Sequence, residues 1–373
     1  MGDLLTAIGL MSGTSMDGID VAMLHTDGKS QVQRGPSSFF PYKADFRKQL
    51  HHVLEDAKAI EVREDRPGSL PRVEKQLTDL HIQAVKAFLE ENALAAEAVD
   101  LLGFHGQTVL HRPEEKLTVQ IGDGNALAKE IGINTVFDMR AADVTNGGQG
   151  APLVPFYHQA LAANLPNEFF GVSPVCFVNI GGISNITYVG EQLIAFDTGP
   201  GNALIDQWVQ QHAGVPYDQG GMIAAEGRID QKLANGLLDH SYFSQPLPKS
   251  LDRLDFSVPE PDWTNLENGA RTLCYVTAAS IIRAAEHLPD APKLWIITGG
   301  GRKNPHIMAD IKAIAEKSDG NVITSEEAGF DGDMMEAEAW AYLAVRSING
   351  LPLTAPGTTG CINETCGGIL TKY

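Results

Sequence analysis

The sequence predicts an α/β protein with two domains. Short apolar runs typical of buried strands end repeatedly in glycine-rich loops, and several of these loops lead into segments with helical spacing. The chain has 373 residues, of which 43% are hydrophobic and 38 are glycine. Because one hydrophobic core rarely grows this large, we expect one domain over residues 1–140 and another over 141–373, with the C-terminal tail able to pack back on the first.

The first half of the chain begins with a predicted β-hairpin. Its two apolar runs are "LLTAIGLM" and "IDVAML", and a short polar loop separates them. A charged stretch follows, and then helical spacing from Val73 to Asn92. "AVDLLGFHGQTVLHRP" predicts a buried strand ending in a polar loop, and "LTVQIGDGNALAKEIGINTVFDMRAADV" predicts strand, loop, helix and strand. The loop "TNGGQGAPLVP" is the candidate hinge between the domains.

The second half repeats the theme of an apolar hairpin followed by glycine loops. "PVCFVNIGGISNITYVG" predicts the hairpin, and in "QLIAFDTGPGNALIDQWVQQHAG" we expect a strand ending at Phe196 and a helix from about Ala203. A helix is expected from about Asn268 to His287, and "KLWIITGGGRKNPHIMADIKAIAE" predicts strand, loop and helix. "GDMMEAEAWAYLAVRSINGLP" predicts an alanine-rich helix, and the remaining tail is expected to be loop.

The charge balance excludes two classes of partner. The formal net charge is −19, which repels nucleic acid and anionic lipid.

The start of the chain lacks the positive charge of a signal peptide, and no uncharged apolar stretch reaches the roughly 18 residues of a membrane helix, so we expect a cytoplasmic protein. We expect free thiols at all four cysteines, with a Cys361–Cys366 disulfide as the alternative, and no zinc site.

Four glycine-rich loops follow apolar strands: "MSGTSMDGID", "NIGGISN", "FDTGPGN" and "ITGGGRKN". None has the spacing of a P-loop or of a Rossmann dinucleotide-binding motif, and each alone could be an ordinary turn. Together they offer backbone N–H and hydroxyl donors that can hold a polyphosphate from opposite sides. The loops therefore favour a nucleotide or another phosphate compound as ligand.

Asp197 is the strongest candidate for a catalytic residue. It follows the apolar run "LIAF", which places it at the carboxyl end of a predicted strand, where α/β proteins bind ligands. A carboxylate there can accept a proton from a hydroxyl or from water. Capping of the following helix, or an Asx-turn, is the alternative role.

Two further polar segments predict contacts with a substrate. In "FHGQTVLHRP", His105 and Gln107 favour a loop that binds a sugar or an amide. Arg140 follows a predicted strand in "DMRAADV" and is a candidate clamp for a substrate carboxylate. An ion pair between Arg140 and an aspartate of the same loop, Asp138 or Asp143, is the alternative.

The glycine loops resemble those of the sugar-kinase, heat-shock-70 and actin superfamily. "GTSMDGID" resembles its first phosphate loop, "FDTGPGN" its second, and "TGGGRKNP" its adenosine loop. The resemblance implies two actin-like, ribonuclease H-like domains with a nucleotide cleft between them.

Six blocks resemble one family of that superfamily, the anhydro-N-acetylmuramic acid kinases. They are "MSGTSMDGID", "HGQTVLHRP", "DMRAADVTNGGQGAPLVP", "NIGGISN", "FDTGPGN" and "GGGRKNP". In the tail "TGCINETCGGIL", cysteines stand where the family has small residues. The family opens the 1,6-anhydro bridge of its sugar with water and phosphorylates O6 from ATP, in peptidoglycan recycling and amino-sugar catabolism. A kinase of another sugar, an actin- or chaperone-like nucleotide switch and a catalytically inactive sugar sensor are the alternatives.

The resemblance also assigns roles to residues. Asp197 is implied as the base for the attacking water, and Mg²⁺ is implied with ATP, with Asp17 and Asp20 as candidates to contact it through water. The implied sugar contacts are Ser12, His105, Gln107, Arg140 (to the lactyl carboxylate), Asp197 and Glu336. A solvated helix face is the alternative for Glu336. The implied ATP contacts are Gly13, Thr14, Ser15, Met16, Asp17, Gly18, Ile19, Asp20, Gly181, Gly182, Gly199, Gly201, Asn202, Gly299, Gly300, Gly301 and Asn304. A homodimer is implied as well.

Overall fold

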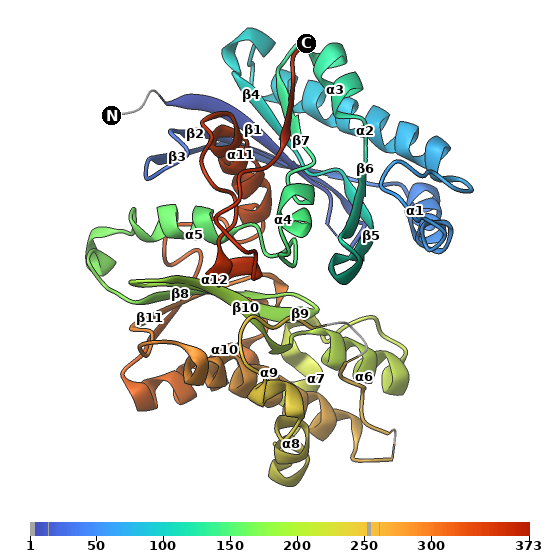
Figure 1. Cartoon of the computed structure of the whole chain (residues 1–373). Coiled ribbons are helices and arrows are strands. Elements are labelled where there is room, and N and C mark those ends of the chain that lie inside the picture. The colour runs from blue at the N-terminus through green and yellow to red at the C-terminus, as the bar shows by residue number, and fades with distance from the viewer. Residues whose placement is uncertain (1–3, 14, 252–254, 261) are drawn as a thin grey trace. The chain divides into compact units, whose positions relative to one another are not determined.

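The computed structural model describes residues 4–13, 15–251, 255–260 and 262–373, and it divides the chain into two compact units (Figure 1). Unit 1 comprises residues 1–164 and 334–373, and unit 2 comprises residues 165–333. This division differs from the boundary expected at residue 140. The loop "TNGGQGAPLVP" lies inside unit 1, where the buried Asp143 accepts hydrogen bonds from Thr354 and Thr359 of the returning C-terminal segment.

Unit 1 contains a six-stranded sheet in the order β13-β7-β4-β1-β2-β3. The strands are β1 (Leu5–Met11), β2 (Gly18–Thr26), β3 (Val32–Pro41), β4 (Leu101–Phe104), β7 (Thr135–Phe137) and β13 (Ile369–Thr371). A separate hairpin consists of β5 (Gln107–Arg112) and β6 (Leu117–Ile121). The expectation that the tail is loop was wrong, because its end forms β13, which pairs with β7 and covers the edge that β7 would otherwise leave open.

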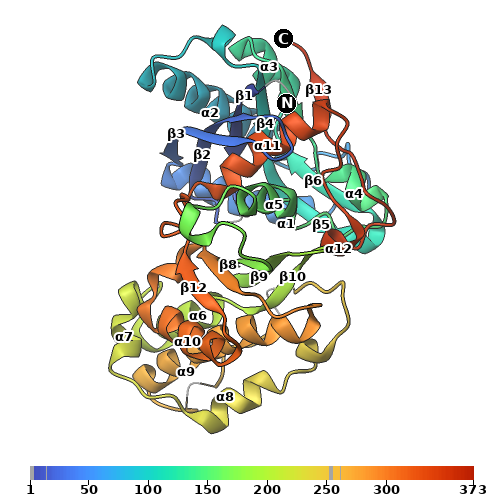
Figure 2. The ribbon, with the colours of Figure 1, turned by 90° about the vertical axis from the view of Figure 1, so that its left-hand side faces the viewer.

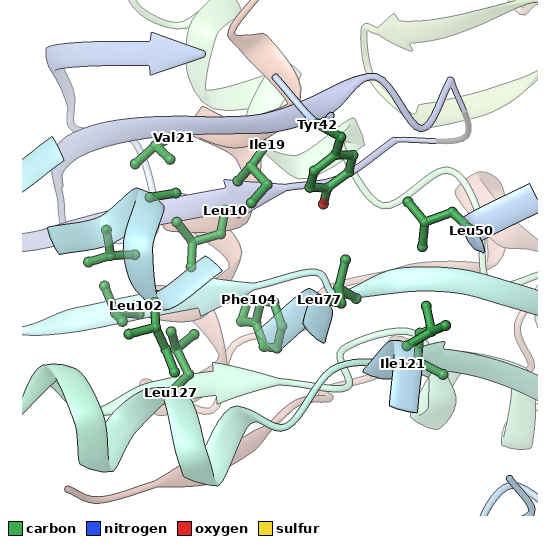
Figure 3. Close-up of a cluster of buried hydrophobic side chains, with 14 of the residues drawn as sticks. Leu10, Ile19, Val21, Tyr42, Leu50, Leu77, Leu102, Phe104, Ile121 and Leu127 are labelled. Carbon is green, nitrogen blue, oxygen red and sulfur yellow. The ribbon is translucent and has the colours of Figure 1, made fainter. Parts of the chain in front are cut away.

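Helices cover both faces of the unit 1 sheet. They are α1 (Ala44–Ala57), α2 (Leu70–Glu91), α3 (Gly124–Ile131), α4 (Ala141–Thr145), α5 (Pro155–Ala162), α11 (Met335–Ile348) and α12 (Pro356–Thr359). Leu50 of α1, Leu77 of α2 and Leu127 of α3 join Leu10 and Phe104 of the sheet in one apolar core (Figure 3). On the opposite face α11 approaches β1 closely, since a Cβ on Gly9 would stand 1.8 Å from the carbonyl oxygen of Ala337.

Unit 2 contains a five-stranded sheet in the order β10-β9-β8-β11-β12. The strands are β8 (Val175–Ile180), β9 (Ile183–Val189), β10 (Leu193–Pro200), β11 (Leu294–Thr298) and β12 (Asn321–Thr324). Its helices are α6 (Ala203–Ala213), α7 (Met222–Ala225), α8 (Gln231–Leu238), α9 (Leu266–Arg283) and α10 (Pro305–Ala315). Helices α6, α9 and α10 pack on one face of this sheet (Figure 2), where Trp208, Ile281 and Ile311 lie in a second apolar core.

Short 3-10 turns complete the two units. They are η1 (Ala96–Ala98), η2 (Pro113–Glu115), η3 (Asn167–Phe169), η4 (Gln219–Gly221), η5 (Ser241–Ser244), η6 (Ala284–His287), η7 (Gly300–Lys303) and η8 (Glu316–Ser318). Among the described residues, no helix has both the length and the apolar character needed to cross a membrane. All four cysteines are unpaired, so the alternative of a Cys361–Cys366 disulfide is not formed.

The two sheets share one strand order. Counted along the chain within each unit, and without the inserted β5–β6 hairpin, both have the order third, second, first, fourth, fifth, with the second strand antiparallel to its neighbours. Unit 1 adds β13 at the end of its sheet. This is the ribonuclease H-like topology that the resemblance implied, and it occurs twice. The two predicted hairpins are β1–β2 and β8–β9.

One predicted strand end was wrong in a way that bears on the site. We expected a strand ending at Phe196, with Asp197 in the following turn, but β10 continues to Pro200. The register of β10 against β9 shifts between Asp197 and Gly199, so Asp197 lies at a β-bulge inside the strand. Bulges redirect side chains and are frequent next to active sites.

Candidate active site

The loop between β1 and β2 presents polar groups to solvent. Ser15 and Asp17 are exposed, and the Ser15 hydroxyl donates to Asp17 Oδ1 at 2.6 Å. Met16 adopts a left-handed backbone (φ 52°), and its N–H donates to the carbonyl oxygen of Gly13 at 3.1 Å. The Asp17 carbonyl accepts the N–H of Tyr42 at 2.8 Å, which ties the loop to the end of β3.

The other predicted residues of this loop occupy different surroundings. Gly18 packs tightly, because a Cβ there would stand 2.4 Å from the Phe39 ring. Met16 and Ile19 have buried side chains, so only their backbone can contact a ligand from this loop. Asp20 is half-buried, and Thr14 lies outside the described residues.

Ser12 and Gln107 form a buried support beneath the loop. Both side chains are 0% exposed. The Ser12 hydroxyl donates to Gln107 Oε1 at 2.7 Å and lies 2.9 Å from the Tyr42 hydroxyl. Gln107 Nε2 donates to the carbonyl oxygen of Gly13 at 3.2 Å, so both ends of the amide are engaged within unit 1.

His105 connects the same loop to Arg140. Its Nε2 lies 3.3 Å from Arg140 Nε and 3.2 Å from Arg140 Nη2, and its Nδ1 lies 3.1 Å from the Ser12 carbonyl oxygen. A guanidinium can only donate, so Nε2 accepts and Nδ1 carries the hydrogen that is donated to Ser12. Burial and the Arg140 charge hold the pKa of His105 well below its usual range, which keeps the ring neutral.

The hydrogen bonds that Arg140 makes in the described structure go to neutral groups. Its Nη1 donates to the Gly150 carbonyl at 2.8 Å, and its guanidinium lies 5.3 Å from the centre of the Trp340 ring. The alternative of an Arg140–aspartate ion pair is not formed in the structure. Asp138 instead pairs with Arg63, and among the described residues no carboxylate lies within ion-pair distance of Arg140. Burial lowers the pKa of Arg140 to about 10.

Glu336 lies in the first turn of α11 and its side chain is exposed. Its negative charge favours the charged form of Arg140, and its effect is larger than that of Asp143. Exposure leaves the carboxylate available either to a ligand or to solvent.

In unit 2, Asp197 is a carboxylate held from one side. The N–H of Leu251 donates to Asp197 Oδ2 at 2.8 Å, and the Tyr242 hydroxyl donates to the Asp197 carbonyl oxygen at 2.5 Å. Removal from water raises the pKa of Asp197 to about 6, and the Leu251 N–H opposes that rise. Such a carboxyl is ionised at neutral pH and still basic enough to take a proton.

The loops after β8 and β10 are joined by backbone hydrogen bonds. The Gly201 N–H donates to the Gly182 carbonyl at 2.9 Å, and the Asn202 N–H donates to the Gly181 carbonyl at 2.7 Å. A Cβ on Gly201 would stand 2.2 Å from the Gly181 oxygen, so only glycine allows this approach. The predicted residues Gly181, Gly182, Gly201 and Asn202 are therefore adjacent. The N–H groups of Gly181, Gly201 and Asn202 are used inside the protein.

The loop after β11 is held against β8. Gly299 has a φ of 73°, and a Cβ on it would stand 2.3 Å from Asn179 Oδ1. A Cβ on Gly301 would stand 2.2 Å from Cγ2 of Ile180. Arg302 locks the loop by donating to the Gly299 carbonyl at 2.8 Å and to Glu326 Oε1 at 2.7 Å.

A cavity of about 300 Å³ adjoins these loops within unit 2. It is lined by Asn202, Ile205, Asp206, Tyr217, Asp218, Gly220, Gly300, Lys303 and Asn304. Three of the lining residues, Asn202, Gly300 and Asn304, are ones that the sequence assigned to nucleotide binding. The sequence analysis missed Asp206, although it lies only one helical turn after "FDTGPGN", and Tyr217, which is 54% exposed.

Most polar groups of the cavity wall are already bonded within unit 2. Asn304 caps α10 and donates to Cys274 Sγ, Asp218 accepts the N–H groups of Ile223 and Ala224, and Lys303 pairs with Asp333. By contrast, the Asp206 carboxylate has no hydrogen-bond or ion-pair partner in the described part of the chain. Burial and the nearby Asp218 raise its pKa to about 6. It remains free to accept hydrogen bonds from a ligand.

Within the described ranges, no three histidine, cysteine, aspartate or glutamate residues come together as a metal site. Asp17 and Asp20 flank the exposed loop of unit 1 but are not joined there by a third such ligand. A cation at this loop would need further oxygen ligands from phosphate or water, which is how Mg²⁺ usually accompanies nucleotides.

Comparison with known proteins gives a match over almost the whole chain. The family model described as anhydro-N-acetylmuramic acid kinase matches residues 5–372. The anhydro-N-acetylmuramic acid kinase of Agrobacterium fabrum is 54% identical over 374 residues, covering 100% of both chains. That of Rhizobium etli is 56% identical over 367 residues, covering 98% of each. Among solved structures, a ROK family glucokinase from Streptomyces griseus covers 91% of this chain and 99% of its own, with 13% identity and a TM-score of 0.41.

Proposed function

Because the chain belongs to the anhydro-N-acetylmuramic acid kinase family, we propose how its residues carry out the reaction of that family. The reaction is an ATP-dependent phosphorylation in which water opens the 1,6-anhydro ring of anhydro-N-acetylmuramic acid and O6 receives the phosphoryl group. The product is N-acetylmuramic acid 6-phosphate, and the reaction is a step of cell-wall recycling.

Asp197 acts as the general base in this proposal. The observation that carries it is a desolvated carboxylate with a pKa of about 6, fixed at one oxygen by the Leu251 N–H. Asp197 takes a proton from water as the water oxygen bonds to C1 and the C1–O6 bond breaks. The released O6 bonds to the γ-phosphorus and ADP leaves, so no separate acid is required. This is the water-activating half of an inverting glycoside hydrolase combined with phosphoryl transfer.

The residues of unit 1 are proposed to bind phosphate and sugar. The segment from Gly13 to Asp20, in which Ser15 and Asp17 are exposed, supplies hydroxyl and backbone donors for the β- and γ-phosphates. Arg140 binds the lactyl carboxylate, because its charge lacks a carboxylate partner among the described residues. Glu336 accepts from a sugar hydroxyl. His105, Gln107 and Ser12 act on the same ligand by holding Arg140 and the loop in place, since their polar groups are buried and bonded.

The cavity of unit 2 is proposed to bind the nucleoside end of ATP. A carboxylate repels phosphate, so Asp206 favours the uncharged end of the nucleotide and accepts from its ribose hydroxyls. Tyr217 offers an exposed ring for contact with the base. Asn202, Gly300 and Asn304 form the wall. Gly199, Gly201, Gly299 and Gly301 let the backbone around this wall pack closely against the rest of unit 2. Gly181 and Gly182 belong to the same group of loops and are proposed to contact ATP with them.

Two finer points belong to the same proposal. Mg²⁺ supplies neutralising charge on the phosphates when it is bound, with Asp17 and Asp20 contacting it through water. The chain is proposed to form a homodimer, which sedimentation of the purified protein tests directly.

The reaction is tested by following oxygen from solvent. Incubation with ATP and anhydro-N-acetylmuramic acid in ¹⁸O-labelled water should place one ¹⁸O at C1 of a sugar 6-phosphate, as read by mass spectrometry. A phosphorylated sugar without label at C1 would favour an ordinary hydroxyl kinase. ATP turnover that ignores every sugar offered would favour a nucleotide switch.

A further inference from the structure

We propose that Lys249 is a positioning residue for Asp197, and that it holds the loop in which the Leu251 N–H meets the carboxylate. The inference rests on the proposed function of Asp197 as the base. It assigns a role to a buried lysine that the reaction itself does not use.

Lys249 has an unusual environment for an ammonium group. It is 8% exposed and has no carboxylate within ion-pair distance in the described residues. Its Nζ lies 3.4 Å from the carbonyl oxygens of Tyr242 and Phe243, 4.8 Å from the centre of the Tyr242 ring and 5.5 Å from that of Phe196. A buried cation is costly unless such oxygens and ring faces surround it, so this side chain has one favourable position.

The groups that face Lys249 come from two further helical segments. His287 Nε2 lies 3.1 Å from Nζ and 2.8 Å from the Phe243 carbonyl oxygen. Arg283 disfavours the charge of Lys249 and Glu286 favours it, while burial is the largest influence and lowers the pKa of Lys249 to about 8. The ammonium is thus held by carbonyl oxygens and aromatic rings.

Two of the residues that contact Lys249, Phe196 and Tyr242, connect it to Asp197. Phe196 precedes Asp197 in β10, and the Tyr242 hydroxyl donates to the Asp197 carbonyl oxygen. A second connection runs along the chain, because Leu251 follows Lys249 by two residues and donates its N–H to Asp197 Oδ2. Two residues of extended chain span at most about 7 Å, so fixing Lys249 restricts where the Leu251 N–H can lie.

This arrangement identifies the reacting oxygen of the base. Oδ2 is taken by Leu251, and Oδ1 has no hydrogen-bond partner in the described part of the chain. Oδ1 is therefore the oxygen that accepts the proton from water. A hydrogen bond to the ionised carboxylate also favours its charged form, so loss of the Leu251 contact raises the pKa of Asp197.

The first variant to test is Lys249→Met, which keeps the length of the side chain and removes the ammonium. We expect kcat to fall about 10- to 100-fold, the range for a hydrogen bond to a charged group. We expect KM for ATP and for the sugar to stay within about twofold, and the acid limb of the kcat profile to move to higher pH. Lys249→Arg should restore part of the lost kcat and move the acid limb part of the way back to its wild-type pH. The exposed Lys232→Met should match the wild type in both.

Leu251→Pro provides a second variant, because it removes the N–H donor and leaves the Lys249 side chain in place. It should shift the acid limb in the same direction as Lys249→Met. A folded Lys249→Met variant with an unmoved limb overturns the inference, whether or not its kcat falls, because a merely structural lysine would not change the titration of Asp197. An unmoved limb in Leu251→Pro overturns it as well.

Asp197→Asn separates this inference from the proposed function. If Asp197→Asn is inactive while Lys249→Met behaves as wild type, only the positioning role fails. If Asp197→Asn keeps full activity, the general base itself has been misassigned.

Discussion

The two units share a strand order but use their first hairpins differently. In unit 1 the loop between β1 and β2 exposes Ser15 and Asp17, whose side chains bond to each other at the surface. In unit 2 the turn between β8 and β9 is Gly181–Gly182, and its carbonyls bind the backbone of residues 201–203. The same scaffold thus offers polar side chains in one unit and a fixed backbone beside a catalytic candidate in the other.

The two units also differ in the sign of the charge at their candidate site residues. Arg140 of unit 1 is a partly buried cation with no carboxylate partner, and Asp197 of unit 2 is a desolvated anion with no cation partner, as far as the described residues show. Leaving a charge uncompensated is unfavourable for folding, so each is explained best by a ligand. A substrate carboxylate suits the first, and the proton of an attacking water suits the second.

Asp197→Asn removes the negative charge of unit 2 and should have the largest effect on turnover. We expect kcat to fall by about 10²- to 10⁴-fold, the usual contribution of a general base, with ATP still bound. Because the pKa of Asp197 is raised in the folded state to about 6, ionisation destabilises the fold as pH rises through about 4 to 6. The variant should therefore have a higher Tm than the wild type at pH 8 and a similar Tm below pH 4. The exposed Asp239→Asn is the control, and unchanged turnover in Asp197→Asn would refute the assignment.

Arg140→Met tests the unpaired cation of unit 1. KM for the sugar should rise about 10- to 100-fold, because a charge-assisted hydrogen-bond pair is lost, while KM for ATP stays constant. Arg140→Lys should recover little, since an ammonium cannot reproduce the planar fork of the guanidinium. Equal losses for both substrates would show that Arg140 supports the fold of unit 1 and does not select the sugar. Steady-state kinetics with each substrate varied in turn makes the distinction.

The pH profile of the wild type tests the ionisation of Asp197. A base with a pKa of about 6 must be deprotonated to act, so kcat should fall about tenfold per unit as pH drops below that value. It should be flat just above it. An acid limb near pH 4 would mean that the working carboxylate is not desolvated in the complex.

Asp206→Ala should have the smallest effect and the narrowest one. The wild type should prefer ATP to 2′-deoxy-ATP, and the variant should lose that preference through a rise of about three- to tenfold in Kd for ATP. Nucleotide affinities measured by calorimetry without sugar provide the readout. A preference that survives in Asp206→Ala would assign ribose recognition elsewhere, and Asp239→Ala serves as the matched control.

Local patterns in the sequence predicted the hairpins and the main candidates. Pairs of apolar runs separated by a short loop located β1–β2 and β8–β9, and position after an apolar run identified Arg140 and Asp197. The unit boundary depended on long-range packing, since residues 334–373 return to the first unit through α11 and β13. Pro166 and Gly332 stand beside the two boundaries, but glycine and proline mark turns throughout the chain and do not report such packing.

The hydrogen-bond partners of the site residues could not be predicted from the sequence. His105 and Gln107 were recognised as polar loop residues, but their full engagement with Ser12, Gly13 and Arg140 depends on side-chain placement. Leu251 contributes only its backbone N–H, which every residue except proline possesses. Such a contact leaves no trace in residue type.

The return of the chain to unit 1 sets an order for its synthesis. The last residue of unit 2 is Asp333, whereas unit 1 lacks α11 and β13 until residues 335–371 have left the ribosome. Gly9 and Gly103 of the unit 1 sheet pack against the backbone of α11, so these positions wait uncovered through translation of the middle of the chain. The unit encoded second is therefore complete first, and a nascent chain released just after residue 333 carries a complete unit 2 and an incomplete unit 1.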